Sequence, residues 1–160
     1  MSGRGYTLQA VATPGHTLNH LAFALPEESA LFSGDHVMAW STTTISPPTG
    51  AMGPYLASLE KLQRRDEKIY WPGHGGPVTD PKRLLRALLH HRRQREHAIL
   101  SRLAAGDTTI DAIVATTYPS LDPRLKRAAA SSVLAHLEHL CERGMVTPSN
   151  LGGDEGYILA

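Results

Sequence analysis

The sequence has little cysteine, few aromatic residues and no long apolar segment. Cys141 is the only cysteine among 160 residues, so no disulfide can form within the chain, and a reducing compartment such as the cytoplasm is expected. No apolar run approaches the roughly 20 residues that a membrane helix needs. The residues after Met1 do not form an apolar segment of the signal-peptide type. We therefore expect no membrane partner.

The sequence also lacks an excess of charge of either sign. Sixteen Lys and Arg residues stand against fifteen Asp and Glu residues, and charged residues make up 19% of the chain. This balance excludes a highly charged disordered chain and a strongly basic nucleic-acid coat. A hydrophobic content of 41% is enough to bury a core without the help of disulfides or metals.

The first half of the chain has the sequence pattern of short strands separated by glycine and proline turns. The Pro and Gly residues between positions 38 and 53 indicate a long loop, and the leucines after Pro54 fall on one face of a helix ending near Arg65. The expected strands cover residues 6–12, 20–25, 30–33 and 68–71, and the second and third should pair as a hairpin.

The second half has the sequence pattern of helices. Asp80 followed by Pro81 is a helix start, and the polar stretch 90–97 in the middle of that helix is typical of a segment that bridges two domains. Helices are expected at 109–117 and 123–142, followed by a hairpin with a glycine-rich tip. Three helices and a hairpin are the order of a winged helix. We expect three parts: residues 1–80, a bridging helix at 81–104, and a winged-helix domain at 105–160.

Three short strings place a potential metal ligand on a sharp turn just after a strand. They are TPGHT with His16, SGDH with Asp35, and PGHG with His74. Glycine allows the backbone to turn tightly, so that the side chain stands at the end of the sheet. Imidazole and carboxylate are the usual protein ligands of a catalytic zinc. One such string alone is mostly just a turn, but three in this order indicate a metal site.

The three strings together resemble the second half of a metallo-β-lactamase-fold hydrolase. The helix that contains HHRRQREHAIL and the winged helix after it resemble the subgroup with a C-terminal winged-helix domain, which includes lactamase-like endoribonucleases and bacterial hydrolases. The resemblance implies an α+β fold, an αββα metallo-β-lactamase-like half-fold followed by a small winged-helix domain.

The resemblance also implies roles for single residues. His16 corresponds to a ligand of the first metal, Asp35 to the bridging carboxylate, and His74 to a ligand of the second metal. The cofactor would be one or two zinc ions, with manganese or iron as alternatives. A metal-bound hydroxide would attack an ester, thioester, lactone or phosphodiester of a small-molecule or RNA substrate. His20 corresponds either to a partner of the ligands or to an ordinary strand residue, and His36 to a structural residue.

The sequence departs from this family in one large respect. The signature H-x-H-x-D-H, which lies upstream in the family, is absent, so no catalytic residue of that motif can be assigned here. The chain looks like a protein that starts in mid-fold: a fragment, a mis-started frame or a split subunit. Each metal would keep one ligand of its own and the bridge, fewer than the three usual for catalytic zinc. A complementing N-terminal half or a homodimer is the expected partner.

The winged helix suggests a second class of function, a non-catalytic module that binds RNA or a protein. Basic residues on the bridging helix and at the start of the last helix could contact phosphates. These candidates are Arg92, Arg93, Arg124, Lys126 and Arg127. Acidic residues around them dilute the charge, and Tyr157 is the only aromatic residue near the expected wing, so base-specific DNA binding is not expected.

Overall fold

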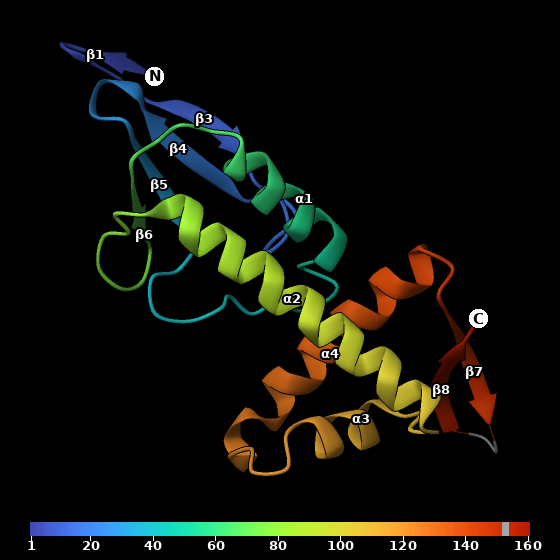
Figure 1. The fold of residues 1–160 in the computed structure, drawn as a ribbon. Coiled ribbons are helices and arrows are strands. Elements are labelled where there is room, and N and C mark those ends of the chain that lie inside the picture. Colours follow the sequence, from blue (N-terminus) through green and yellow to red (C-terminus); the bar gives the residue numbers. More distant parts are fainter. Residues whose placement is uncertain (152–153) are drawn as a thin grey trace.

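A computed structural model describes residues 1–151 and 154–160 (Figure 1). The strands are β1 (Ser2–Gly3), β2 (Tyr6–Thr7), β3 (Gln9–Ala12), β4 (Leu21–Leu25), β5 (Ala30–Gly34), β6 (Ile69–Pro72), β7 (Val146–Leu151) and β8 (Asp154–Leu159). The α-helices are α1 (Met52–Gln63), α2 (Pro81–Ala104), α3 (Ile110–Thr117) and α4 (Lys126–Glu142). The glycine-rich tip predicted between β7 and β8 contains Gly152 and Gly153, which lie outside the described residues.

A four-stranded sheet in the order β3-β4-β5-β6 forms the first part of the chain. Strands β3, β4 and β5 pair antiparallel, and β4 and β5 make the predicted hairpin. β6 pairs parallel with β5 because α1 carries the chain back between them. The carboxyl ends of β5 and β6 therefore lie at the same edge of the sheet.

Buried and exposed side chains alternate along the strands, which gives the sheet one buried face. Ala22, Ala24, Leu31 and Tyr70 point toward α1 and α2, which lie across this face (Figure 1). They pack against buried leucines of both helices, including Leu59, Leu62 and Leu85. Burial of this set supplies the main hydrophobic stabilisation of the first part of the chain.

The opposite face of the sheet is apolar and partly open to solvent. Phe32 is 43% exposed and Trp71 is 44% exposed, and Phe32 pairs with Phe23 on one side and with Trp71 on the other. Leu21, on the same face of β4 as Phe23, is also exposed. We call Leu21, Phe23, Phe32 and Trp71 the outer sheet face. A row of aromatic residues across three strands, with Phe32 and Trp71 exposed and Phe23 half-buried, is unusual on a surface that has no partner.

Helix α2 connects the sheet to the second core. Asp80 accepts a hydrogen bond from the Arg83 N–H at 3.0 Å, and Pro81 occupies the first position, as the sequence predicts. The first half of α2 packs on the sheet through Leu85 and Leu89, and the second half packs in another cluster through Ile99 and Leu103. The helix runs from one cluster to the other in Figure 1.

The second cluster has the predicted order of helices followed by a hairpin. Thr109 caps α3 by accepting a hydrogen bond from the Ala112 N–H at 3.2 Å. The Tyr157 N–H in β8 donates to the Thr108 carbonyl at 2.8 Å, which ties the hairpin to the start of α3. Buried residues of α2, α3, α4 and β7 complete this core, among them Ile113, Leu137 and Val146.

Several boundaries differ from the sequence predictions, and the helix expected at 123–142 is divided into a 3₁₀ helix (Pro123–Leu125) and α4 (Lys126–Glu142). The expected strand 6–12 is divided into β2, which pairs with β1, and β3, which belongs to the main sheet. The helix expected from Pro54 to Arg65 begins at Met52 and ends at Gln63. Proline is tolerated at the third helical position because the first backbone N–H groups of a helix have no partner within it. None of the helices in the described ranges is both long and apolar enough to cross a membrane.

The buried His136 of α4 should make the free energy of unfolding depend on pH. Its side chain is 1% exposed, and neither ring nitrogen has a hydrogen-bond partner among the described residues. Burial, assisted by the charge of Arg92, lowers the pKa of His136 to about 3. The unfolded chain takes up this proton near pH 6.5 and the folded chain does not, so stability is lost as pH falls below that value.

We expect this one histidine to lower the free energy of unfolding by about 2 kcal/mol between pH 7 and pH 5. Urea unfolding of the wild type and of His136→Leu at both values measures the effect, which the variant should lack. His97→Leu is the matched control, because His97 is exposed on α2. If the wild type and His136→Leu lose the same free energy of unfolding between pH 7 and pH 5, His136 is protonated in the folded chain.

Candidate metal centre

His16 stands on a tight turn after β3. Gly15 has φ +146°, and a Cβ at this position would overlap the backbone of Tyr55. The Gly15 N–H donates to the Thr17 carbonyl at 2.9 Å, and the Gly15 carbonyl accepts from the Ala51 N–H at 2.9 Å. The glycine thus lets the turn pack directly against the start of α1 and holds His16 beside the loop that precedes this helix.

Two threonines of that loop orient the His16 ring. The Thr44 carbonyl lies 2.8 Å from Nδ1 of His16, and the Thr43 hydroxyl oxygen lies 3.1 Å from the same nitrogen. A carbonyl can only accept, so Nδ1 carries the hydrogen and donates it to Thr44. Nε2 of His16 is then left as the nitrogen with a free lone pair. Ligand histidines are commonly oriented through their other ring nitrogen in this way.

Asp35 and His74 meet at the edge where the parallel strands β5 and β6 end. Oδ1 of Asp35 and Nε2 of His74 are 3.6 Å apart, and both side chains are partly open to solvent. The Gly73 N–H donates to the Gly34 carbonyl at 2.9 Å, which keeps the two turns together. A Cβ at Gly73 would overlap the Asp35 carboxylate, so this position needs a glycine.

Two further histidines lie between these turns and the core. His20 has its Nδ1 2.8 Å from the Thr13 hydroxyl oxygen, and its ring centroid lies 6.4 Å from that of His16. The His36 ring is fully buried, with its centroid 5.6 Å from that of His20 and 4.7 Å from that of Tyr55.

The environment of both histidines favours their neutral forms. Burial lowers the pKa of His20, and the nearby His16 lowers it further, whereas the Asp35 carboxylate opposes the shift. Burial also lowers the pKa of His36 to about 3, with smaller contributions from His20 and His16. A cluster of neutral imidazoles beside a carboxylate has the chemistry of a metal site, because a ligand nitrogen must be unprotonated.

The residues present fit part of a metal centre. Two ligand atoms bound at about 2.1 Å to a tetrahedral zinc lie about 3.4 Å apart, close to the 3.6 Å between Asp35 and His74. His16 presents an oriented imidazole of the right type. However, across residues 1–151 and 154–160 no three His, Cys, Asp or Glu side chains come close enough to hold one ion.

The structure corrects the predicted nucleic-acid contacts at one position. Arg92 is 3% exposed, so it cannot contact a phosphate, and the polar stretch 90–97 is not exposed to solvent on every side. The loop before α1 and helix α4 cover it. Arg93 is exposed but lies 3.4 Å from Glu60. Arg124 is exposed and is paired with Asp122.

Lys126 and Arg127, the remaining candidates, are exposed at the start of α4.

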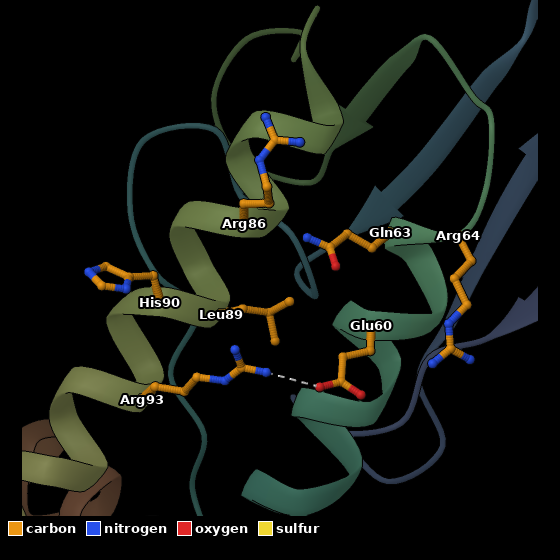
Figure 2. Close-up of a pocket in the computed structure, with 7 residues that line it drawn as sticks. All are labelled: Glu60, Gln63, Arg64, Arg86, Leu89, His90 and Arg93. Carbon is orange, nitrogen blue, oxygen red and sulfur yellow. Dashed lines mark hydrogen bonds and ion pairs between the residues drawn. The ribbon is translucent and has the colours of Figure 1, made fainter.

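A groove of about 560 Å³ between α1 and α2 is separate from these histidines. Figure 2 shows Leu89 pointing into it and Arg93 reaching toward Glu60, whereas Arg86 and His90 point away from each other. None of His16, Asp35 and His74 lines the groove. Its charged groups do not converge on one point, so the chemistry of the candidate site lies at the sheet edge and not here.

Sequence reasoning missed Thr43 and Thr44 as partners of His16. It predicted a long loop at 38–53, but no motif distinguishes these two threonines from their neighbours Ser41 and Thr42. The contact of Tyr55 with His36 was also missed, because it depends on how α1 packs on the sheet.

Two family models match the chain. The model of the metallo-beta-lactamase superfamily matches residues 3–74, which contain all three candidate ligands. The model of the beta-lactamase associated winged helix domain matches residues 109–151.

Curated relatives and solved structures give the same result. A beta-lactamase-like protein 2 homolog from Caenorhabditis elegans is 32% identical over 144 residues, which cover 89% of this chain and 47% of that protein. An atrochrysone carboxyl ACP thioesterase from Aspergillus fumigatus is 34% identical over 99 residues, 62% of this chain and 30% of that protein. A crystal structure of a metallo-beta-lactamase family protein from Thermus thermophilus superimposes with a TM-score of 0.84 at 28% identity, over 100% of this chain and 52% of that one.

A sheet covered by helices on one face, with ligand-type side chains on turns at its edge and a winged helix behind it, defines a protein of the metallo-β-lactamase fold. The chain belongs to the metallo-β-lactamase superfamily and carries the winged helix domain associated with it. It spans about half the length of the curated relatives that cover most of it.

Proposed function

We propose that this chain supplies the C-terminal half of a metal-dependent hydrolase, with His16, Asp35 and His74 as metal ligands. The observation that carries the proposal is the 3.6 Å approach of Asp35 and His74 at the sheet edge. The orientation of His16 by the Thr44 carbonyl supports it. Zinc is the proposed ion, because imidazole nitrogen and carboxylate oxygen are among its usual ligands.

The roles of the chain's own residues follow from their geometry. The three ligands would bind and orient the ion, and Asp35 would also neutralise part of its charge. The neutral, buried His36 fills the space behind His20 and excludes water from the inner side of the site. When bound, the metal would activate water and polarise the scissile group of the substrate.

The proposed substrates are carbonyl compounds with a good leaving group, thioesters first. The thioesterase relative from Aspergillus fumigatus matches 62% of this chain. This similarity favours a thioester substrate over a phosphodiester. Esters and lactones react by the same attack on a carbonyl carbon.

The proposed partner is a polypeptide that covers the outer sheet face and completes the ligand set. The chain matches about half of its relatives, and an apolar row runs across β4, β5 and β6 on the face opposite α1 and α2. Stacked sheets pack through such apolar faces about 10 Å apart. The occupant would therefore be a second sheet of the same superfamily, fused to this chain or separate from it.

A fluorescence measurement tests the coverage of the outer sheet face. Trp71 lies on this face, and Trp40 is the only other tryptophan, so a Trp40→Phe variant reports on Trp71 alone. We expect its emission to shift to shorter wavelength when the N-terminal half of the Thermus thermophilus relative is fused upstream of residue 1. Unchanged emission would contradict coverage of this face. A shift that depends on the concentration of the unfused chain would show that a second copy is the occupant.

The same fusion protein tests the proposed hydrolase. Loaded with zinc, it should hydrolyse a thioester such as an acyl-CoA, and Asp35→Asn in the fusion should reduce turnover by more than about 100-fold, since a metal ligand is lost. The control is Asp66→Asn, because Asp66 is an exposed carboxylate that pairs only with Lys82. A folded, zinc-loaded fusion no more active than its Asp35→Asn variant would contradict the proposal.

A further inference from the structure

Arg92 is a buried cation with no carboxylate partner among the described residues. Its guanidinium donates a hydrogen bond to the Thr43 carbonyl and lies over the Tyr55 ring, with Cζ 5.3 Å from the ring centroid. Its Nε has no hydrogen-bond partner in the described ranges. Burying a charge without an opposite charge is unfavourable, so this arginine is poorly explained by its contribution to stability alone.

The peptide that Arg92 holds is directly followed by the one whose carbonyl orients His16. The Thr43 carbonyl accepts from Arg92, while the Thr43 hydroxyl lies 3.1 Å from Nδ1 of His16. The next carbonyl in the chain, that of Thr44, accepts from the same nitrogen at 2.8 Å. Thr43 is 2% exposed, so water cannot easily replace its contact with Arg92, whereas Thr44 is exposed. Two successive peptides of the loop thus lie between the guanidinium on α2 and the imidazole on the turn after β3.

We propose that Arg92 is a positioning residue for His16. By fixing the Thr43–Thr44 peptide, it keeps the following Thr44 carbonyl aimed at Nδ1, and so keeps Nε2 of His16 as the nitrogen with a free lone pair. Only the identity of what His16 binds rests on the proposed function. The orientation of the ring is a property of the metal-free chain.

The alternative is that Arg92 only fills space between α1, α2 and α4. The two explanations differ in what Arg92→Met does, because methionine is of similar length and carries no charge. Replacing an unpaired buried charge by an apolar side chain is often neutral or stabilising. If Arg92 only fills space, the variant leaves the His16 ring as it was. If Arg92 positions the loop, the fold persists and the ring loses its preferred tautomer.

The experiment is long-range ¹H–¹⁵N NMR of the histidine rings in the metal-free chain at pH 8, with His16 assigned from the signals missing in His16→Gln. In the wild type we expect His16 to show the tautomer with hydrogen on Nδ1. Arg92→Met should give averaged nitrogen shifts typical of two exchanging tautomers, and Arg92→Lys should restore part of the wild-type signal. Arg93→Met is the control, because Arg93 is the exposed neighbour on the same helix.

Thr43→Val gives an independent test that keeps the guanidinium in place. It removes the hydroxyl near His16 while leaving the carbonyl that Arg92 binds, so its effect on the ring should be smaller than that of Arg92→Met. Unchanged His16 signals in Arg92→Met would overturn the proposal, and so would a wild-type ring without a preferred tautomer.

Zinc affinity provides a readout that separates this proposal from the proposed function. Loss of an outer partner of a ligand histidine typically weakens metal binding 10- to 100-fold, which is the loss expected for Arg92→Met. If the wild-type chain binds no zinc but Arg92→Met still changes the His16 ring, the metal site is wrong and the positioning role stands. If zinc binds equally well to both, Arg92 does not position His16.

Discussion

Replacing Asp35 by Asn should lower the affinity of the chain for zinc by more than about 100-fold, since loss of outer partners alone typically weakens metal binding 10- to 100-fold. The substitution keeps the shape of the side chain and removes the charge that holds the cation. Oδ1 of Asp35 lies 3.6 Å from Nε2 of His74, another ligand candidate. The substitution therefore also breaks up the Asp35–His74 ligand pair. A competition titration against a chromophoric chelator measures the change.

The stability of the fold should hardly respond to Asp35→Asn. The Asp35 side chain is 38% exposed, and surface substitutions usually change stability by less than about 0.5 kcal/mol. Asp66→Asn serves as the control for a general effect of charge. If Asp35→Asn binds zinc as tightly as the wild type, Asp35 is not a ligand and the assignment of the site at this sheet edge is wrong.

Gly15→Ala should lower the free energy of unfolding by about 3 kcal/mol or more, because strain from a positive φ adds to a collision with a packed backbone. Gly15 has φ +146°, and an added Cβ would meet the Tyr55 backbone, which cannot move without displacing α1. For a chain of this size, such a loss corresponds to a fall of roughly 6–12 °C in the unfolding midpoint. Thermal unfolding followed by circular dichroism measures it.

Gly76→Ala is the matched control for this prediction. Gly76 lies in the turn after His74, has open space where its Cβ would be, and does not have a positive φ. Its substitution should shift the midpoint by no more than about 2 °C. Equal midpoints for Gly15→Ala and the wild type would mean that the turn does not pack tightly against the start of α1 as described.

Local patterns carried enough information to predict most of the elements. The hairpin of the strands at 20–25 and 30–33, the helix start at Asp80 and the leucine spacing of α1 each depend on neighbours in sequence, and the structure confirms these elements. The ligand candidates are predictable for the same reason, because each follows a strand directly and a glycine fixes its turn. Asp35 and His74 meet because β5 and β6 are parallel neighbours.

The parts that sequence reasoning missed depend on contacts between distant segments. Arg92 lies in a stretch of charged residues and looks solvent-exposed, yet the loop before α1 folds over it and the Thr43 carbonyl, 49 positions earlier, accepts its hydrogen bond. His36 was interpreted as a structural residue, but its approach to the Tyr55 ring, 4.7 Å between centroids, depends on how α1 packs on the sheet. No periodicity in the sequence encodes either approach.

Elemental analysis for zinc, made on the fusion of this chain to the N-terminal half of the Thermus thermophilus relative, tests most directly whether His16, Asp35 and His74 are metal ligands. The comparison is a variant in which all three are replaced by alanine, with His97→Ala as the control at an exposed histidine. We expect near-stoichiometric zinc in the wild-type fusion and in the control, and much less in the triple variant. A wild-type fusion that holds no zinc, or a triple variant that holds as much as the wild type, would contradict this assignment of the ligands.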